Sequence, residues 1–109
     1  MVRRVLVLWE NPLFFDAVRL LLRQPGVTLV GATSDHKALS DLARSTKPHV
    51  VVIEKTGLKN KDEKLALSLL KEELNVIFLS LDDNDLDFYR SHHHTEASVD
   101  DLFNLIWEE

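Results

Sequence analysis

Short apolar runs alternate with amphipathic segments along the whole chain. Apolar runs of this length are typical of strands that are covered on both faces. Four such strands are predicted, near residues 5–8, 27–32, 50–53 and 76–81. In the segments that follow them, apolar residues recur every three or four positions, as they do on one face of a helix. The corresponding helices are predicted near residues 13–23, 34–43, 62–74 and 98–106. This alternation favours a parallel sheet with helices on both faces.

Local start and stop signals support these boundaries. Asn11 offers a capping amide, and Pro12 stands at the first helical position that follows it. A Pro-Gly pair at residues 25–26 ends the same helix. Ser98 and Asp101 have the spacing of a capping box, which predicts the start of the last helix. No internal repeat or low-complexity linker interrupts the chain, so one domain spanning residues 1–109 is expected.

The segment 82–97 fits this alternation poorly. Its sixteen residues are too few for an ordinary helix, a strand and their loops. The acidic run 82–85 is a poor helix interior, and the run Ser-His-His-His at residues 91–94 is unlike a buried strand. We therefore expect a doubly wound parallel sheet of the flavodoxin-like order 2-1-3-4-5. Its fourth helix and its fifth strand, placed near residues 90–95, are expected to be shortened or irregular.

Composition excludes several classes of function. The net charge is −5, and acidic residues concentrate late in the chain, which argues against nucleic-acid binding by this domain. The chain has no cysteine, so disulfides and thiolate metal sites are excluded. No run approaches the ~20 apolar residues that span a bilayer. The first residues lack the features of a signal peptide, so a cytoplasmic protein is expected.

The predicted topology brings polar residues together at one edge of the sheet. In such folds, ligands bind beyond the carboxyl ends of the strands, where the strand order reverses. Glu10 and Glu54 follow the first and third strands, and Ser80 ends the neighbouring fourth strand. Carboxylate and hydroxyl oxygens suit hard divalent cations. Since two protein ligands seldom suffice, Glu10 and Glu54 either bind a divalent cation weakly or remain carboxylates screened by water. No other cofactor is expected.

With these residues in place, the chain resembles the receiver domain of bacterial response regulators in two-component signal transduction. Residues 5–14 resemble the opening strand, acidic pair and helix start of that family. Residues 47–54 are similar to its proline-led third strand, which ends in the phosphate-accepting aspartate. Residues 76–80 are similar to its fourth strand, which ends in Ser or Thr. The resemblance implies that Glu54 occupies the phosphoacceptor position.

Several positions depart from the receiver pattern. Trp9 replaces the first member of the acidic pair, and Glu10 keeps an acid in the second place. Glu54 is one methylene longer than the expected aspartate, and Thr95 stands where a lysine is expected. Only Ser80 matches outright. Phosphoryl transfer depends on alignment and charge compensation, so these departures predict a degenerate acidic pocket with no catalytic residue. Glu54 is then either a fixed negative charge or a solvated acid without a role.

These observations predict a pseudo-receiver: a non-enzymatic signalling module that acts through protein–protein interaction, either with a protein partner or as a homodimer. The alternatives are a switch that responds to a ligand, metal or pH, and a receiver weakly phosphorylated on Glu54. Receiver relatives often bind partners through the region that is altered here. Four residues there either form an interface or cover the thinned edge of the sheet: Leu86, Phe88, Tyr89 and Trp107.

The run of three histidines at residues 92–94 has two interpretations. Alternate residues of a strand share one face, so the imidazoles suit adventitious Ni²⁺ or Zn²⁺ binding. A solvated loop is the other interpretation, because no cysteine or second cluster completes a metal site. Histidine is the side chain that ordinarily changes its charge between pH 5 and 8, which adds a pH-sensitive edge to the hypotheses.

Overall fold

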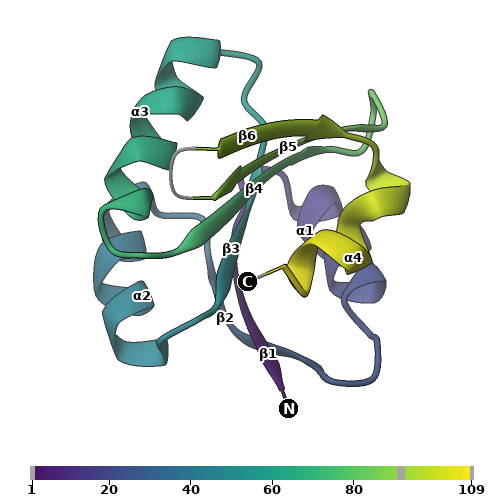
Figure 1. The fold of residues 1–109 in the computed structure, drawn as a ribbon, viewed down its shortest axis with the longest axis horizontal. Helices are drawn as coiled ribbons and strands as arrows, with labels where there is room; N and C mark the ends of the chain where they lie inside the picture. Colours follow the sequence, from purple (N-terminus) through teal and green to yellow (C-terminus); the bar gives the residue numbers. More distant parts are fainter. Residues whose placement is uncertain (1, 91–92, 109) are drawn as a thin grey trace.

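The computed structural model describes residues 2–90 and 93–108, and within them the strands form one mixed, six-stranded sheet (Figure 1). The strand order is β2-β1-β3-β4-β5-β6. The strands are β1 (Arg3–Leu8), β2 (Val27–Thr33), β3 (Val50–Glu54), β4 (Asn75–Ser80), β5 (Asp85–Arg90) and β6 (His93–Ala97). Strands β1 to β4 pair in parallel, whereas β4, β5 and β6 pair antiparallel.

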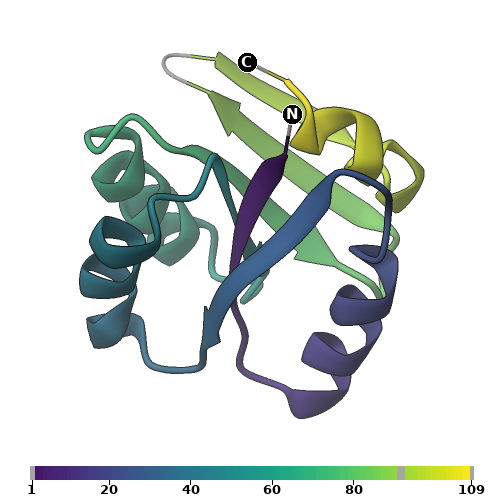
Figure 2. The same cartoon turned by 90° about the horizontal axis from the view of Figure 1, so that it is seen from below.

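Helices cover both faces of the sheet, two on each side (Figure 2). The α-helices are α1 (Pro12–Leu21), α2 (Leu39–Thr46), α3 (Lys59–Leu70) and α4 (Leu102–Ile106). Short 3₁₀ helices precede two of them, η1 (His36–Ala38) before α2 and η2 (Val99–Asp101) before α4. Helices α1 and α4 pack on one face, and α2 and α3 pack on the other. No helix of the described residues is long and apolar enough to cross a membrane.

Alternate strand residues supply the two halves of the core, because successive side chains of a strand point to opposite faces. Val5 and Val7 of β1 pack under α1 and α4, whereas Leu6 and Leu8 pack under α2 and α3. All four are buried. The continuous apolar runs in the sequence therefore become central strands covered on both faces.

Each strand and helix predicted up to β4 is present, although α3 is Lys59–Leu70 and not 62–74. Asn11 caps α1, since its Oδ1 accepts the backbone N–H of Leu13 at 2.9 Å. At the last helix, the backbone N–H of Ser98 donates to the Asp101 carboxylate at 3.1 Å, as the capping pattern predicts. The segment between these parts is where the structure differs from the prediction.

The doubly wound parallel sheet of order 2-1-3-4-5 is wrong, because the chain turns back after β4 instead of crossing over. Residues 81–84 form a tight turn in which Asn84 has a left-handed φ of 52°. Strand β5 then pairs antiparallel with β4. The described residues of this segment form no helix, and instead of one strand near residues 90–95, β5 ends at Arg90 and β6 begins at His93. Residues 91–92 lie outside the described part of the chain.

The residue pattern explains this outcome. Asp85, Leu86, Asp87 and Phe88 alternate polar and apolar side chains with the period of a half-buried strand. Leu86 and Phe88 point into the core beneath α1 and α4. Two short antiparallel strands also need far fewer residues than a helix, a strand and two loops. The sixteen-residue segment that is too short for a crossover is long enough for two strands.

A buried arginine ties the two ends of the chain together. Arg3 opens β1, and only 5% of its surface is exposed. Its Nε donates to the carbonyl oxygen of Ile106 at 2.8 Å, and its Nη2 donates to the carbonyl oxygen of Glu108. These groups lie at the carboxyl end of α4, where backbone carbonyls lack helical partners and a positive charge is favoured. Arg3 therefore fixes α4 against the sheet.

Candidate functional site

Glu54 lies where the sequence places it, at the carboxyl end of β3, but its carboxylate is engaged by the backbone. Oε1 accepts the N–H groups of Glu10 and Asn11, each at 2.9 Å. The contact follows from the sheet, because Leu8 and Ile53 are paired neighbours and the loop after β1 begins beside the end of β3. Glu54 thus holds the loop that leads into α1.

Trp9 and Glu10 do not form an acidic pocket with Glu54. The Trp9 ring stacks on Phe15, with 5.6 Å between ring centroids, and packs against the core beneath α1. The Glu10 carboxylate lies 3.4 Å from Nε2 of His36, a distance that gives an ion pair only when the imidazole is protonated. Trp9 therefore acts as a packing residue, and Glu10 faces η1.

Ser80 lies near Glu54, whereas Thr95 does not. Ser80 and Glu54 line one shallow cavity of about 350 Å³ together with Asn11 and Lys55. The Ser80 hydroxyl contacts Asp83, donating to Oδ2 at 3.3 Å and accepting its N–H at 3.4 Å, so it closes the turn after β4. Thr95 is exposed on β6, where β4 and β5 separate it from β3.

The weak cation site predicted at Glu10 and Glu54 gains no third ligand from the described residues. One oxygen of Glu54 already accepts two N–H groups, and Glu10 is directed toward His36. Within the described part of the chain, a three-residue group with ligand atoms close enough for one ion lies elsewhere, at Asp87, His94 and Glu96.

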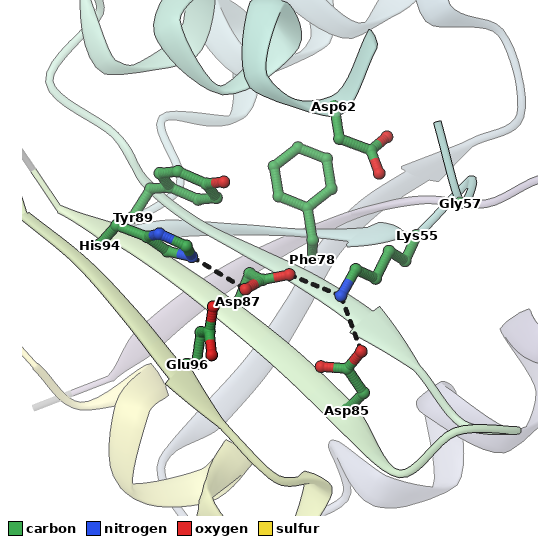
Figure 3. Close-up of a pocket in the computed structure, with 9 residues that line it drawn as sticks. All are labelled: Lys55, Gly57, Asp62, Phe78, Asp85, Asp87, Tyr89, His94 and Glu96. Carbon is green, nitrogen blue, oxygen red and sulfur yellow. Dashed lines mark hydrogen bonds and ion pairs between the residues drawn. The ribbon is translucent and has the colours of Figure 1, made fainter. Parts of the chain in front are cut away.

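A second cavity, of about 270 Å³, lies on the other side of Lys55 (Figure 3). Lys55 follows β3 and reaches across to β5, where its Nζ lies 2.8 Å from Asp85 Oδ2 and 2.7 Å from Asp87 Oδ2. The other oxygen of Asp87 lies 2.8 Å from Nε2 of His94. The residues lining the cavity are Lys55, Gly57, Asp62, Phe78, Asp85, Asp87, Tyr89, His94 and Glu96.

Electrostatics keep the pair at the centre of this cavity ionised. Burial alone would raise the pKa of Asp87, but hydrogen bonds from Lys55 and His94 outweigh it and hold that pKa below its ordinary value. Burial alone would likewise lower the pKa of Lys55, and the bonds to Asp85 and Asp87 raise it instead. A lysine held in the protonated form is a poor nucleophile, so the arrangement suits binding better than covalent catalysis.

The four residues considered for an interface have different positions. Leu86 and Phe88 are 0% and 5% exposed and belong to the core, so they cover the edge of the sheet rather than present a surface. The Tyr89 ring stacks on the His94 imidazole at 4.4 Å between centroids. Trp107 is half-buried beside Phe103, and within the described residues its Nε1 has no hydrogen-bond partner.

The cluster around Lys55 was not identified from the sequence. Its signal is the alternation that also marks the two antiparallel strands, since Asp85 and Asp87 share one face of β5, as His94 and Glu96 share one face of β6. Recognising that Asp87 would stand opposite Glu96 requires the register of the two strands. A single parallel strand, as predicted here, does not contain this register.

Comparisons with protein-family models, with curated proteins and with solved structures give no match to this chain. The resemblance to receiver domains therefore rests on the residues and spacings of the sequence itself.

Proposed function

We propose that this chain is a receiver-like signalling module that acts through protein–protein interaction and is not switched by phosphorylation. The observation that supports it best is the engagement of Glu54. Its Oε1 accepts two backbone N–H groups at 2.9 Å, from Glu10 and Asn11. A carboxylate used in this way stabilises one conformation of the loop, which suits a constant binding surface.

Phosphorylation of Glu54 would work against these contacts. An acyl phosphate on Oε1 converts the charged carboxylate acceptor into the bridging oxygen of a mixed anhydride, which is a weaker acceptor for both hydrogen bonds. Phosphoryl transfer also needs compensating charge around the transferred group. Trp9 brings an indole to the position of an acidic residue, and Thr95 is on the distant edge strand. These features favour a module with one conformation.

Exposed leucines on α1 support protein binding as the activity. Leu13 and Leu20 are 74% and 59% exposed. They are seven residues apart, so they lie on the same side of the helix, with Ala17 between them. An apolar stripe with this spacing is the usual feature by which a helix docks into a groove of a partner protein. The stripe begins next to the loop that Glu54 holds.

The first experiment tests the absence of a phosphorylation cycle. The purified protein is incubated with acetyl phosphate and Mg²⁺, and intact mass is compared with that of a Glu54→Gln variant. We expect no acid-labile phosphoryl group on either protein. Stoichiometric modification of the wild type that disappears in Glu54→Gln would refute the proposal.

The second experiment tests the binding surface. Sedimentation velocity measures self-association, and cross-linking in the native cell identifies partners of the wild type. We expect the double change Leu13→Glu and Leu20→Glu to abolish the association. A matched control is Leu67→Glu on α3, which is 62% exposed on the opposite side of the sheet and should have no effect. Equal behaviour of both variants would exclude α1 as the binding surface.

A further inference from the structure

On the α3 side of the sheet, β5 and β6 carry three side chains that are potential metal ligands. Asp87 stands directly opposite Glu96 in the register of the two strands, and His94 is two residues from Glu96 on the same face of β6. One ligand atom from each residue lies within 4.8 Å of the others. Figure 3 shows the imidazole and both carboxylates gathered at one end of the cavity.

The imidazole is held in an orientation that suits coordination. The His94 ring lies flat on Tyr89, with an interplanar angle of 4°, and its Nε2 points toward Asp87 Oδ1 at 2.8 Å. Packing of this kind against the imidazole fixes the direction of a ligand nitrogen before an ion binds. Asp87 is positioned in turn by Lys55, which contacts Oδ2 and leaves Oδ1 facing His94.

The charges around the cluster favour a cation. Four carboxylates line the cavity, from Asp62, Asp85, Asp87 and Glu96, against the single ammonium of Lys55. Within the described residues, Glu96 makes no hydrogen bond or ion pair, although its carboxylate lies close to that of Asp87. Two neighbouring carboxylates repel each other, and a divalent cation between them removes that cost.

We propose that Asp87, His94 and Glu96 form a binding site for a divalent transition metal of the Zn²⁺ class. An imidazole nitrogen with two carboxylate oxygens suits Zn²⁺, Co²⁺ or Ni²⁺, whereas Mg²⁺ and Ca²⁺ prefer oxygen ligands alone. Zinc takes N and O ligands at about 2.0–2.2 Å, so atoms bound to one ion lie roughly 3–4 Å apart. Side-chain movements of about 1 Å bring atoms within 4.8 Å to that spacing.

The site differs from binding by the histidine run itself. His93 points to the opposite face of β6, so it contributes no ligand to this cluster. Glu96 and Asp87 are not part of the run, and their contribution separates a built site from adventitious binding by neighbouring histidines. The site also does not depend on the proposed binding surface of α1.

The test uses tag-free protein titrated with ZnCl₂, CoCl₂ or MgCl₂ by calorimetry, with Co²⁺ absorption bands as a spectroscopic readout. We expect one Zn²⁺ or Co²⁺ per chain, a rise in Tm on binding, and no response to Mg²⁺. His94→Gln and Glu96→Gln should each weaken binding at least about tenfold, since even indirect ligand support is worth 10–100-fold. The matched control His93→Gln should retain wild-type affinity.

Three results would overturn the proposal. The first is the absence of Zn²⁺ binding to the folded protein at millimolar metal. The second is unchanged affinity in Glu96→Gln, which would assign the ion to histidines alone. The third is a loss of binding in His92→Gln or His93→Gln equal to that in His94→Gln, which would indicate an adventitious ion only. Circular dichroism of each variant separates loss of a ligand from loss of folding.

Discussion

Shortening or removing the Glu54 side chain should destabilise the protein, whereas removing only its charge should not. Glu54 holds the β1–α1 loop through one oxygen that accepts the N–H groups of Glu10 and Asn11 at 2.9 Å. In Glu54→Gln an amide oxygen takes the place of Oε1 and both contacts persist. In Glu54→Ala both N–H groups lose their acceptor. Glu54→Asp withdraws the acceptor by one methylene.

The magnitude follows from two hydrogen bonds at a half-buried position. Each intramolecular hydrogen bond contributes about 0.5–1.5 kcal/mol to stability, and exposure to water keeps these two in the lower part of that range. Glu54→Ala should therefore lower the free energy of unfolding by about 1–2 kcal/mol. For a domain of this size that corresponds to a drop in Tm of roughly 4–10 °C. Glu54→Gln should stay within about 0.5 kcal/mol of wild type.

The assay is urea denaturation followed by circular dichroism, with Tm from a thermal scan and backbone amide exchange of the loop by NMR. The expected order of stability is wild type, then Glu54→Gln, then Glu54→Asp close to Glu54→Ala. Faster exchange in the last two variants should be confined to the amides of Glu10 and Asn11. Equal stability of all four proteins would refute the structural role of Glu54. A Glu54→Gln variant as unstable as Glu54→Ala would show that charge, not hydrogen bonding, matters.

Two further predictions concern the start of β1. Arg3→Met should lower the free energy of unfolding by about 2–3 kcal/mol, because the carbonyl groups of Ile106 and Glu108 lose a buried, charged donor. Urea denaturation measures this loss, and a variant as stable as the wild type would contradict the prediction. Burial and the charges of Arg3 and Arg4 hold the pKa of His49 below its ordinary value. The neutral imidazole therefore contributes its full stability above pH ~6.5, and this contribution is lost as the pH falls through the folded-state pKa. Between pH 7.5 and 5.5, the wild type should therefore lose more stability than His49→Asn, a variant that keeps an acceptor for the Arg4 N–H. Parallel plots of stability against pH for the two proteins would contradict this prediction.

The order of strands through β4 could be predicted because its signals are local. Continuous apolar runs such as residues 50–53, set between helical periods, indicate parallel strands covered on both faces whatever lies beyond them. The position of Glu54 at the end of β3 follows directly. Its hydrogen bonds do not, since the same carboxylate is compatible with a free acid at the sheet edge.

The remainder of the sheet required a choice between two competing patterns. Alternation of apolar and polar residues in Asp85–Phe88 indicates a half-buried strand, but the preceding βα units imply that the next strand follows a helix. The length of segment 82–97 indicates correctly that a helix, a strand and their loops do not fit there. The parallel pattern of the preceding units instead predicts one strand near residues 90–95, which does not contain the register that brings Asp87 opposite Glu96.

The antiparallel strands and the surroundings of Glu54 are linked through Lys55. This residue follows Glu54 directly and lines both cavities, yet its ammonium is bound to Asp85 and Asp87 of β5. Strand β5 therefore directs the positive charge next to Glu54 toward the cavity that Asp87 and His94 line. The pairing of Lys55 with β5 thus separates the surroundings of Glu54 from the cavity at Asp87, and the Glu54 and metal-binding experiments examine the two places independently.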